Sequence, residues 1–256
     1  MRLRSIAFAV LGFALFVGAW HLLTLGHGVA EVAGPWLTMV GIGEVMAAGH
    51  LWKNIVASVF RVSWGFCHAA AVGIPLGIVL GWSPRCKMTF NPVIQALRPI
   101  SPIAWIPIAV LMFGGHGLLS ADFSAIFLVF LASFFPIVTA TTSAVASVDQ
   151  KFIRSARNFG VEGLPFFRRV LVPAAMPQIL TGLRLALGIS WVVVVAAEMV
   201  GVERGLGFQV NDSRNAIRFD HVEAAMVVIA IIGLLLDSGM SRIESAALAR
   251  RGMSRR

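Results

Sequence analysis

The chain has 256 residues, of which 58% are hydrophobic and only 13% are charged. Soluble domains are close to half apolar and about a quarter charged, so this composition excludes an ordinary water-soluble globule, and the high hydrophobicity also excludes a disordered chain. Several apolar runs approach the length of about 20 residues that a helix needs to cross a bilayer. The sequence therefore predicts an all-α, polytopic membrane protein with about six crossings.

The first crossing is expected from Ile6 to about Leu25, after a basic start at Arg2 and Arg4. A signal peptide is the competing interpretation, because it also combines a basic start with an apolar run. The run is longer than a usual signal core and no clean cleavage site follows it, which favours an uncleaved helix. Residues 26–50 contain glycines and Pro35 and are predicted to form an external loop, so residues 1–50 are set apart from a core region, 51–256.

The core region opens with an amphipathic stretch, Leu51–Arg61, that leads into a second span over Val62–Leu80. Residues 83–87 form a basic turn. Four prolines then interrupt the sequence, so we expect an interfacial segment at 91–98 and a kinked third span from Trp105 to Phe113.

A glycine-rich turn at 114–117 is expected after the third span. The remaining spans are predicted at Phe123–Val145, Gln178–Val200 and Val222–Met240.

The basic residues are distributed unevenly between the two sides of such a six-span chain. Fourteen Lys and Arg residues fall in the N-terminal start, the turn at 83–87, the segment 149–176 and the C-terminal tail, whereas the opposite loops hold Arg204, Arg214 and Arg218. This is the positive-inside pattern, and it predicts that both termini are cytoplasmic. The net charge of +9 is then explained by anionic lipid at the inner face, and no nucleic-acid-binding module is present.

Sequence signatures of several catalytic sites are absent. There is no phosphate-binding Gly-x4-Gly-Lys loop, no metal-binding His-Glu-x-x-His or Cys-x-x-Cys spacing and no Gly-x-Ser-x-Gly elbow. The six histidines are scattered near predicted membrane edges, which favours interfacial positions over metal ligation. No paired polar groups at membrane depth are recognisable, so the sequence predicts neither a catalytic nor a metal site.

The segment 149–176 carries the most informative pattern. A short helix is predicted from Asp149, which can cap its start, to Phe159, with Gly160 in the left-handed conformation that ends it. A second helix is predicted over Pro165–Leu171, and Pro173 is expected to break the chain. One face of the first helix carries its apolar residues (Phe152, Ile153, Ala156, Phe159). Taken by itself, the segment is equally consistent with a hairpin lying on anionic lipid.

The spacing within this segment resembles the coupling loop of ABC-importer permeases, in which Glu-Ala-Ala is followed by three residues, Gly, nine residues and Ile-x-Leu-Pro. Ala156, Gly160 and Pro173 match this pattern, while Arg154 stands in place of the Glu and Ser155 in place of the first Ala. Further stretches are similar to the nitrate, sulfonate, taurine and bicarbonate permease family. They are Arg98–Pro107 (RPISPIAWIP), Gly182–Arg184, Gly188–Trp191, Ala196–Met199 and Gly205–Phe208.

This resemblance implies a type I ABC-importer permease in a bacterial inner membrane. In that family two permease copies assemble with two cytoplasmic ATPase subunits, which bind ATP and Mg²⁺, and an external binding protein delivers the solute. The chain itself would then need no cofactor and have no catalytic site. The resemblance places seven residues in the contact with the ATPase: Arg154, Ser155, Ala156, Arg157, Phe159, Gly160 and Pro173.

Other polar residues are weaker candidates. Arg98, Trp105, Arg184 and Glu198 are candidates for the solute pathway or its gate. For the two arginines, snorkelling or bonding to helix-end carbonyls is the alternative, and for Glu198 a packing or hydrogen-bonding role. Thr139, Thr141, Thr142 and Ser143 either line a polar path or bond their own helix. Asp212, Arg214 and Arg218 either receive the binding protein or form an ordinary hydrated loop.

The expected cargo is a small oxyanion such as nitrate, bicarbonate or an organosulfonate, with neutral aromatic or pyrimidine solutes left open. The alternative function is a self-sufficient ion-coupled transporter or channel. Such a protein is expected to carry intramembrane acids and inverted repeats, and neither is evident in the sequence.

Overall fold

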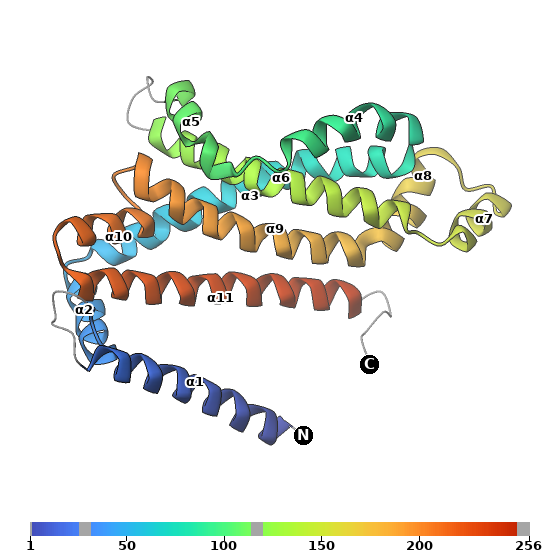
Figure 1. Ribbon diagram of the computed structural model, residues 1–256. Helices are drawn as coiled ribbons and strands as arrows, with labels where there is room; N and C mark the ends of the chain where they lie inside the picture. Colours follow the sequence, from blue (N-terminus) through green and yellow to red (C-terminus); the bar gives the residue numbers. More distant parts are fainter. Residues whose placement is uncertain (1, 26–31, 114–119, 250–256) are drawn as a thin grey trace.

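The structure is a computed structural model that describes residues 2–25, 32–113 and 120–249. These ranges are helical and contain no strand, which confirms the all-α prediction (Figure 1). The helices are α1 (Arg2–Thr24), α2 (Pro35–Ala47), α3 (His50–Trp82), α4 (Pro84–Leu97), α5 (Ile106–Phe113), α6 (Ser120–Ala146), α7 (Gln150–Asn158), α8 (Gly163–Phe166), α9 (Val172–Gly201), α10 (Leu206–Asn215) and α11 (Phe219–Ala249). A 3₁₀ turn, Pro102–Trp105, precedes α5, and a π-helical segment, Phe167–Leu171, joins α8 to α9.

Four helices of the described chain are long and apolar enough to cross a membrane: α3, α6, the continuous helix from Gly163 to Gly201, and α11. α4 and the helix Pro102–Phe113, which meet at an angle of 82°, are long and apolar enough for a fifth crossing when they are counted as one bent span. Within α1, the apolar part Val10–Thr24 is shorter than these. The stretch Arg98–Pro107 forms the bend between α4 and α5, because its prolines interrupt regular helical hydrogen bonding.

The prediction of an external loop at 26–50 is wrong for the second half of that segment, because Pro35–Ala47 forms α2. Pro35 occupies the first turn of that helix, where its missing N–H leaves no donor unpaired. The stretch Leu51–Arg61 is not a separate element, since α3 runs unbroken from His50 to Trp82 and accommodates Pro75. The turn predicted at 114–117 lies outside the described residues.

Two further boundaries differ from the prediction. The basic turn at 83–87 is the start of α4, where the Ser83 hydroxyl accepts a hydrogen bond from the Cys86 N–H, so the segment 91–98 continues a longer helix. Pro173 does not break the chain. The π-helical segment runs directly into α9, and Pro173 lies in the first turn of that helix, where a proline is tolerated.

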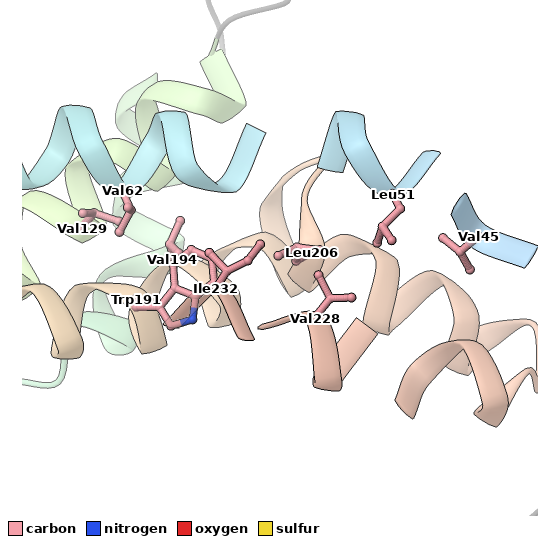
Figure 2. Close-up of a cluster of buried hydrophobic side chains, with 9 residues drawn as sticks. All are labelled: Val45, Leu51, Val62, Val129, Trp191, Val194, Leu206, Val228 and Ile232. Carbon is pink, nitrogen blue, oxygen red and sulfur yellow. The ribbon is translucent and has the colours of Figure 1, made fainter. Parts of the chain in front are cut away.

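The bundle packs through small residues on α3 and α9. A Cβ added to Gly65 or Gly77 of α3 would collide with Val129 or Thr141 of α6, and one added to Gly182 of α9 would collide with the Ala140 Cβ. Close approach of this kind is how membrane helices gain packing contacts without a hydrophobic drive. At one end, a cluster of nine buried side chains joins α2, α3, α6, α9, α10 and α11 (Figure 2).

The elements fall at two ends of the bundle. The start of α1, the hairpin α7–α8 and the last turn of α11 lie at one end, and α2 and α10 lie at the other (Figure 1). α1 diverges from the remaining helices, with apolar side chains such as Phe13 and Leu23 exposed.

Candidate functional site

The hairpin at one end of the bundle, residues 149–171, is held in shape by local hydrogen bonds. The Asp149 carboxylate accepts a bond of 2.9 Å from the Lys151 N–H and caps α7. Gly160 has φ of 70°, and the N–H groups of Gly160 and Val161 close the helix on the carbonyls of Arg157 and Ala156, both at 2.9 Å. The predicted short helix and its left-handed glycine are therefore confirmed.

A buried face fastens the hairpin to the transmembrane helices. Ile153 and Ala156 of α7 pack in one cluster with Phe166, Leu171 and residues at the end of α6. The Trp82 ring at the end of α3 lies 5.2 Å from the Phe166 ring and 5.4 Å from the Phe167 ring, measured between centroids. A displacement of the hairpin must therefore displace the ends of α3, α6 and α9 as well, since tightly packed cores transmit strain.

The opposite face of the hairpin is polar and aromatic. Arg154, Ser155, Arg157 and Gly160 are exposed. Phe152 and Phe159 were expected on the apolar face, but they are 58% and 84% exposed. Of the seven residues predicted to contact an ATPase, Ala156 is buried and Pro173 half-buried, and the other five lie on the exposed surface.

A buried ion pair at the other end of the bundle is the main feature that sequence reasoning missed. Arg61 of α3 and Glu198 of α9 lie 2.5 Å apart, between Nη1 and Oε1, with side chains 4% and 0% exposed. Glu198 also accepts hydrogen bonds from the Ser58 hydroxyl at 2.8 Å and from the Gly207 N–H at 3.1 Å. Arg61 in turn donates to Asp122 at the start of α6.

Side chains of α3 hold the turn between α9 and α10 through its backbone. Gly205 donates its N–H to Asn54 at 3.1 Å, and Leu206 donates to the Ser58 hydroxyl at 2.9 Å. Arg61 Nη1 donates to the Arg204 carbonyl at 2.7 Å. Because these groups are buried and each has a partner, α3, α9 and α10 form one interlocked unit at this end.

Buried paired polar groups therefore exist that the sequence analysis did not recognise. The signal that could have revealed them is the presence of Arg61 and Glu198 inside apolar runs, since a charge there needs a partner. Sequence reasoning treated the two residues separately because they are 137 positions apart in the chain.

The remaining pathway candidates lie in different environments. Arg184 forms a two-pronged ion pair with Asp237 of α11, both bonds at 2.7 Å, so its guanidinium bonds to a carboxylate and not to helix-end carbonyls. Arg98 is exposed directly after α4. Trp105 is half-buried against the cluster around Ile106. The structure thus does not gather Arg98, Arg184 and Glu198 into one site.

The three residues expected to receive a binding protein lie in or after α10. Asp212 lines a polar pocket of about 420 Å³ together with Lys53 and Arg204. Arg214 donates to Asn211 at 2.8 Å. Arg218 instead links α2 to α11, through Glu44 at 2.6 Å and Asp220 at 2.7 Å.

Glu44, Asp220 and His221 place their ligand atoms close enough together to surround a metal ion. The Arg218 guanidinium already lies among them and donates to both carboxylates. The hydrogen bond from Arg218 lowers the pKa of Glu44, and a hydrogen bond with His221 lowers it further. The cluster is therefore best described as an ion-pair network that anchors α2.

The sequence of the chain matches a known protein family. Residues 73–246 match the family described as the binding-protein-dependent transport system inner membrane component. The chain is 38% identical over 208 residues to the taurine transport system permease protein of Escherichia coli (strain K12), covering 81% of this chain and 74% of that protein. It is 40% identical over 240 residues to the nitrate import permease protein of Synechocystis sp., covering 91% of this chain and 86% of that protein.

The fold also has relatives among solved structures. The chain aligns with a structure of the MetNI methionine ABC transporter in an inward-facing conformation, with a TM-score of 0.63 and 19% identity, over 83% of this chain and 97% of the other. At this identity the likeness concerns the fold, which is that of a type I ABC importer permease.

Proposed function

The chain belongs to the family of binding-protein-dependent transport system inner membrane components, and we propose that it carries small oxyanions such as nitrate, bicarbonate or organosulfonates. As a permease subunit of an ABC importer, it spans the inner membrane several times. The proposed substrate class is supported by the names of the relatives that cover most of the chain, which transport taurine and nitrate. A third, from Bacillus subtilis, is named for aliphatic sulfonates and is 31% identical over 238 residues.

The observation that carries the proposed mechanism is the rigid hairpin, residues 149–171. We propose that its exposed surface, with Arg154, Arg157 and Phe159, contacts a cytoplasmic ATPase that holds ATP and Mg²⁺. Closure of two such ATPases around ATP would move two permease copies together and switch the pathway from inward-open to outward-open. The packing of the hairpin on α3, α6 and α9 supports this, because a loosely attached loop would not transmit a displacement.

The proposed orientation places both termini and the hairpin in the cytoplasm. The excess of basic residues in these segments supports it. The start of α1, the hairpin and the last turn of α11 lie at one end of the bundle, which is consistent with the same orientation (Figure 1). The opposite end, with α10 and its Asp212 and Arg214, would then face the external binding protein, where complementary charges speed association.

Reconstitution tests this proposal. The permease is placed in liposomes with its ATPase, ATP is supplied on the ATPase side, and the binding protein is supplied on the other side. We expect ATP-dependent uptake of radiolabelled nitrate or taurine that requires both partners. Uptake that persists without ATPase and ATP would contradict an ABC importer, and uptake confined to neutral aromatic solutes would contradict the substrate class.

A second candidate, an ion-coupled transporter, is favoured only by the buried carboxylate of Glu198. That carboxylate is already paired with Arg61 and accepts two further hydrogen bonds. A proton or sodium gradient applied to the same liposomes without ATP separates the two candidates, since only a secondary transporter would respond with uptake.

A further inference from the structure

A cavity of about 470 Å³ lies between α3, α4 and α6, close to the hairpin. Its floor includes Leu80, Ile94 and Val138, which form a buried apolar cluster. Ser147, at its rim, stands two residues before Asp149, the cap of α7. The cavity therefore lies at the end of the bundle that is proposed to face the cytoplasm.

Two helices supply its polar walls. Lys87 and Asn91 lie one turn apart on α4. Thr139, Ser143 and Ser147 follow each other at intervals of four residues along α6 and its end. Residues four apart share one face of a helix, so each set forms a stripe along one side of the cavity.

The donors in these walls determine which ligand the cavity can hold. Thr139 and Ser147 already donate to backbone carbonyls of their own helix. Within the described part of the chain, the side chains of Lys87, Asn91 and Ser143 have no hydrogen bond or ion pair. They offer an ammonium, an amide N–H₂ and a hydroxyl, and no described lining residue carries a carboxylate.

We propose that this cavity is a release-side binding site for a small monovalent oxyanion, in which Lys87 supplies the charge and Asn91 and Ser143 supply hydrogen bonds. The assignment of the ligand to transported solute rests on the proposed function. One cation matches one negative charge, and the three donors match the several acceptor oxygens of nitrate or a sulfonate. Lys87 and Ser143 are exposed and Asn91 is half-buried, so the charge lies at the mouth of the cavity.

The test measures binding of nitrate and of methanesulfonate to the complete transporter without nucleotide, in nanodiscs of phosphatidylcholine, by isothermal titration calorimetry. The binding protein is omitted so that its own site does not contribute. Lys87→Gln is expected to weaken binding about tenfold, the scale of one charge-assisted hydrogen bond. The matched control is Arg85→Gln, which removes an exposed charge from the same helix without touching the cavity and should change affinity less than about twofold. Ser143→Ala should give a smaller loss than Lys87→Gln.

Equal affinities for the wild type and Lys87→Gln would overturn the site, as would equal losses in Lys87→Gln and Arg85→Gln. ATP-driven uptake is measured in parallel in the liposomes that contain the ATPase and the binding protein. It separates failure of the proposed site from failure of the proposed function. If uptake is intact while Lys87→Gln binds normally, only the site is wrong. If the wild type shows no ATP-driven uptake but anion binding still depends on Lys87, the cavity remains an anion site and the importer proposal is wrong.

The phosphate of an anionic lipid has the same chemistry, so a second set of nanodiscs contains phosphatidylglycerol. A transported solute as the occupant predicts similar nitrate affinity in both membranes. Loss of nitrate binding in phosphatidylglycerol, together with weaker retention of that lipid by Lys87→Gln, would identify the headgroup as occupant and overturn the release-side assignment.

Discussion

At the scale of single residues, the pair Arg61–Glu198 joins the helices at the end of the bundle opposite the hairpin. Both side chains are almost completely buried, and together they accept or donate bonds to α3, α6, α9 and α10. A buried pair adds little net stability compared with apolar residues, but removal of one partner leaves a charge without compensation. The pair therefore holds α3 and α9 together, and loss of either partner is expected to destabilise the protein.

Arg61→Met is expected to destabilise the protein by about 3–5 kcal/mol, because Glu198 would lose its cationic partner in a site that is 0% exposed. Asp122→Asn removes the charge of the other acidic partner of Arg61. The Asp122 side chain is 31% exposed, so this substitution should lower the stability much less than Arg61→Met. Thermal unfolding of the two variants in detergent provides the comparison. Similar losses of thermal stability in the two variants would show that the ion pair with Glu198 contributes no more to stability than the ion pair with Asp122.

Gly205 is the second residue whose identity the structure explains. It has φ of 130°, and an added Cβ would collide with the Glu198 carboxylate. Gly205→Ala is therefore expected to lower stability by about 2 kcal/mol through backbone strain and loss of the carboxylate position. Gly188→Ala, in α9 with open space around it, is the control and should be neutral or slightly stabilising. If both variants melt alike, the turn is not held by this contact.

Residue contacts of this kind could not be predicted from the sequence. Arg61, Asn54 and Ser58 lie on one face of α3, but their partners on α9 and α10 lie more than 130 positions later. The sequence showed charges within apolar runs and nothing that paired them. The link between Arg184 and Asp237 was missed for the same reason.

At the scale of elements, the hairpin was predictable because its signals are local. An acidic cap, a short amphipathic run and a glycine determine α7, and all three act over a few residues. Prolines were misleading elsewhere. Pro35 and Pro173 lie in the first turns of α2 and α9, where proline is tolerated in any helix. Pro75 lies within α3, because membrane helices accept prolines that would end a soluble helix.

The geometry of the hairpin can be tested at Gly160. Its φ of 70° disfavours any residue with a branched side chain, although the surrounding space is open. Gly160→Val is expected to distort the turn and to reduce co-purification of the ATPase at least several-fold. Asn adopts this conformation readily, so Gly160→Asn should retain the ATPase. Equal retention by the two variants would show that the shape of the turn does not matter for ATPase contact.

At the scale of the whole molecule, composition and the distribution of charge predicted a helical membrane protein, and the fold and the family confirm it. The number of crossings was harder to predict, because α4 and α5 meet at a sharp bend and α1 is apolar over a shorter stretch. Sequence patterns mark apolar length, whereas the angle between two helices depends on what packs against them.

The molecule has a polar hairpin at one end and an interlocked turn at the other, joined by α3 and α9. The central claim is that the force from closure of the ATPases around ATP enters through the hairpin. The claim requires the hairpin to lie in the cytoplasm and to touch the ATPase. Phe159, at the end of α7 and 84% exposed, is the position from which both requirements can be measured.

The decisive measurement is labelling of Phe159→Cys by a membrane-impermeant maleimide, with Cys67 and Cys86 replaced by Ser so that only one thiol remains. We predict rapid labelling in inside-out vesicles stripped of ATPase, none in right-side-out vesicles, and strong protection when the ATPase is added back. Labelling from the outside, or equal labelling with and without the ATPase, would contradict the proposed coupling.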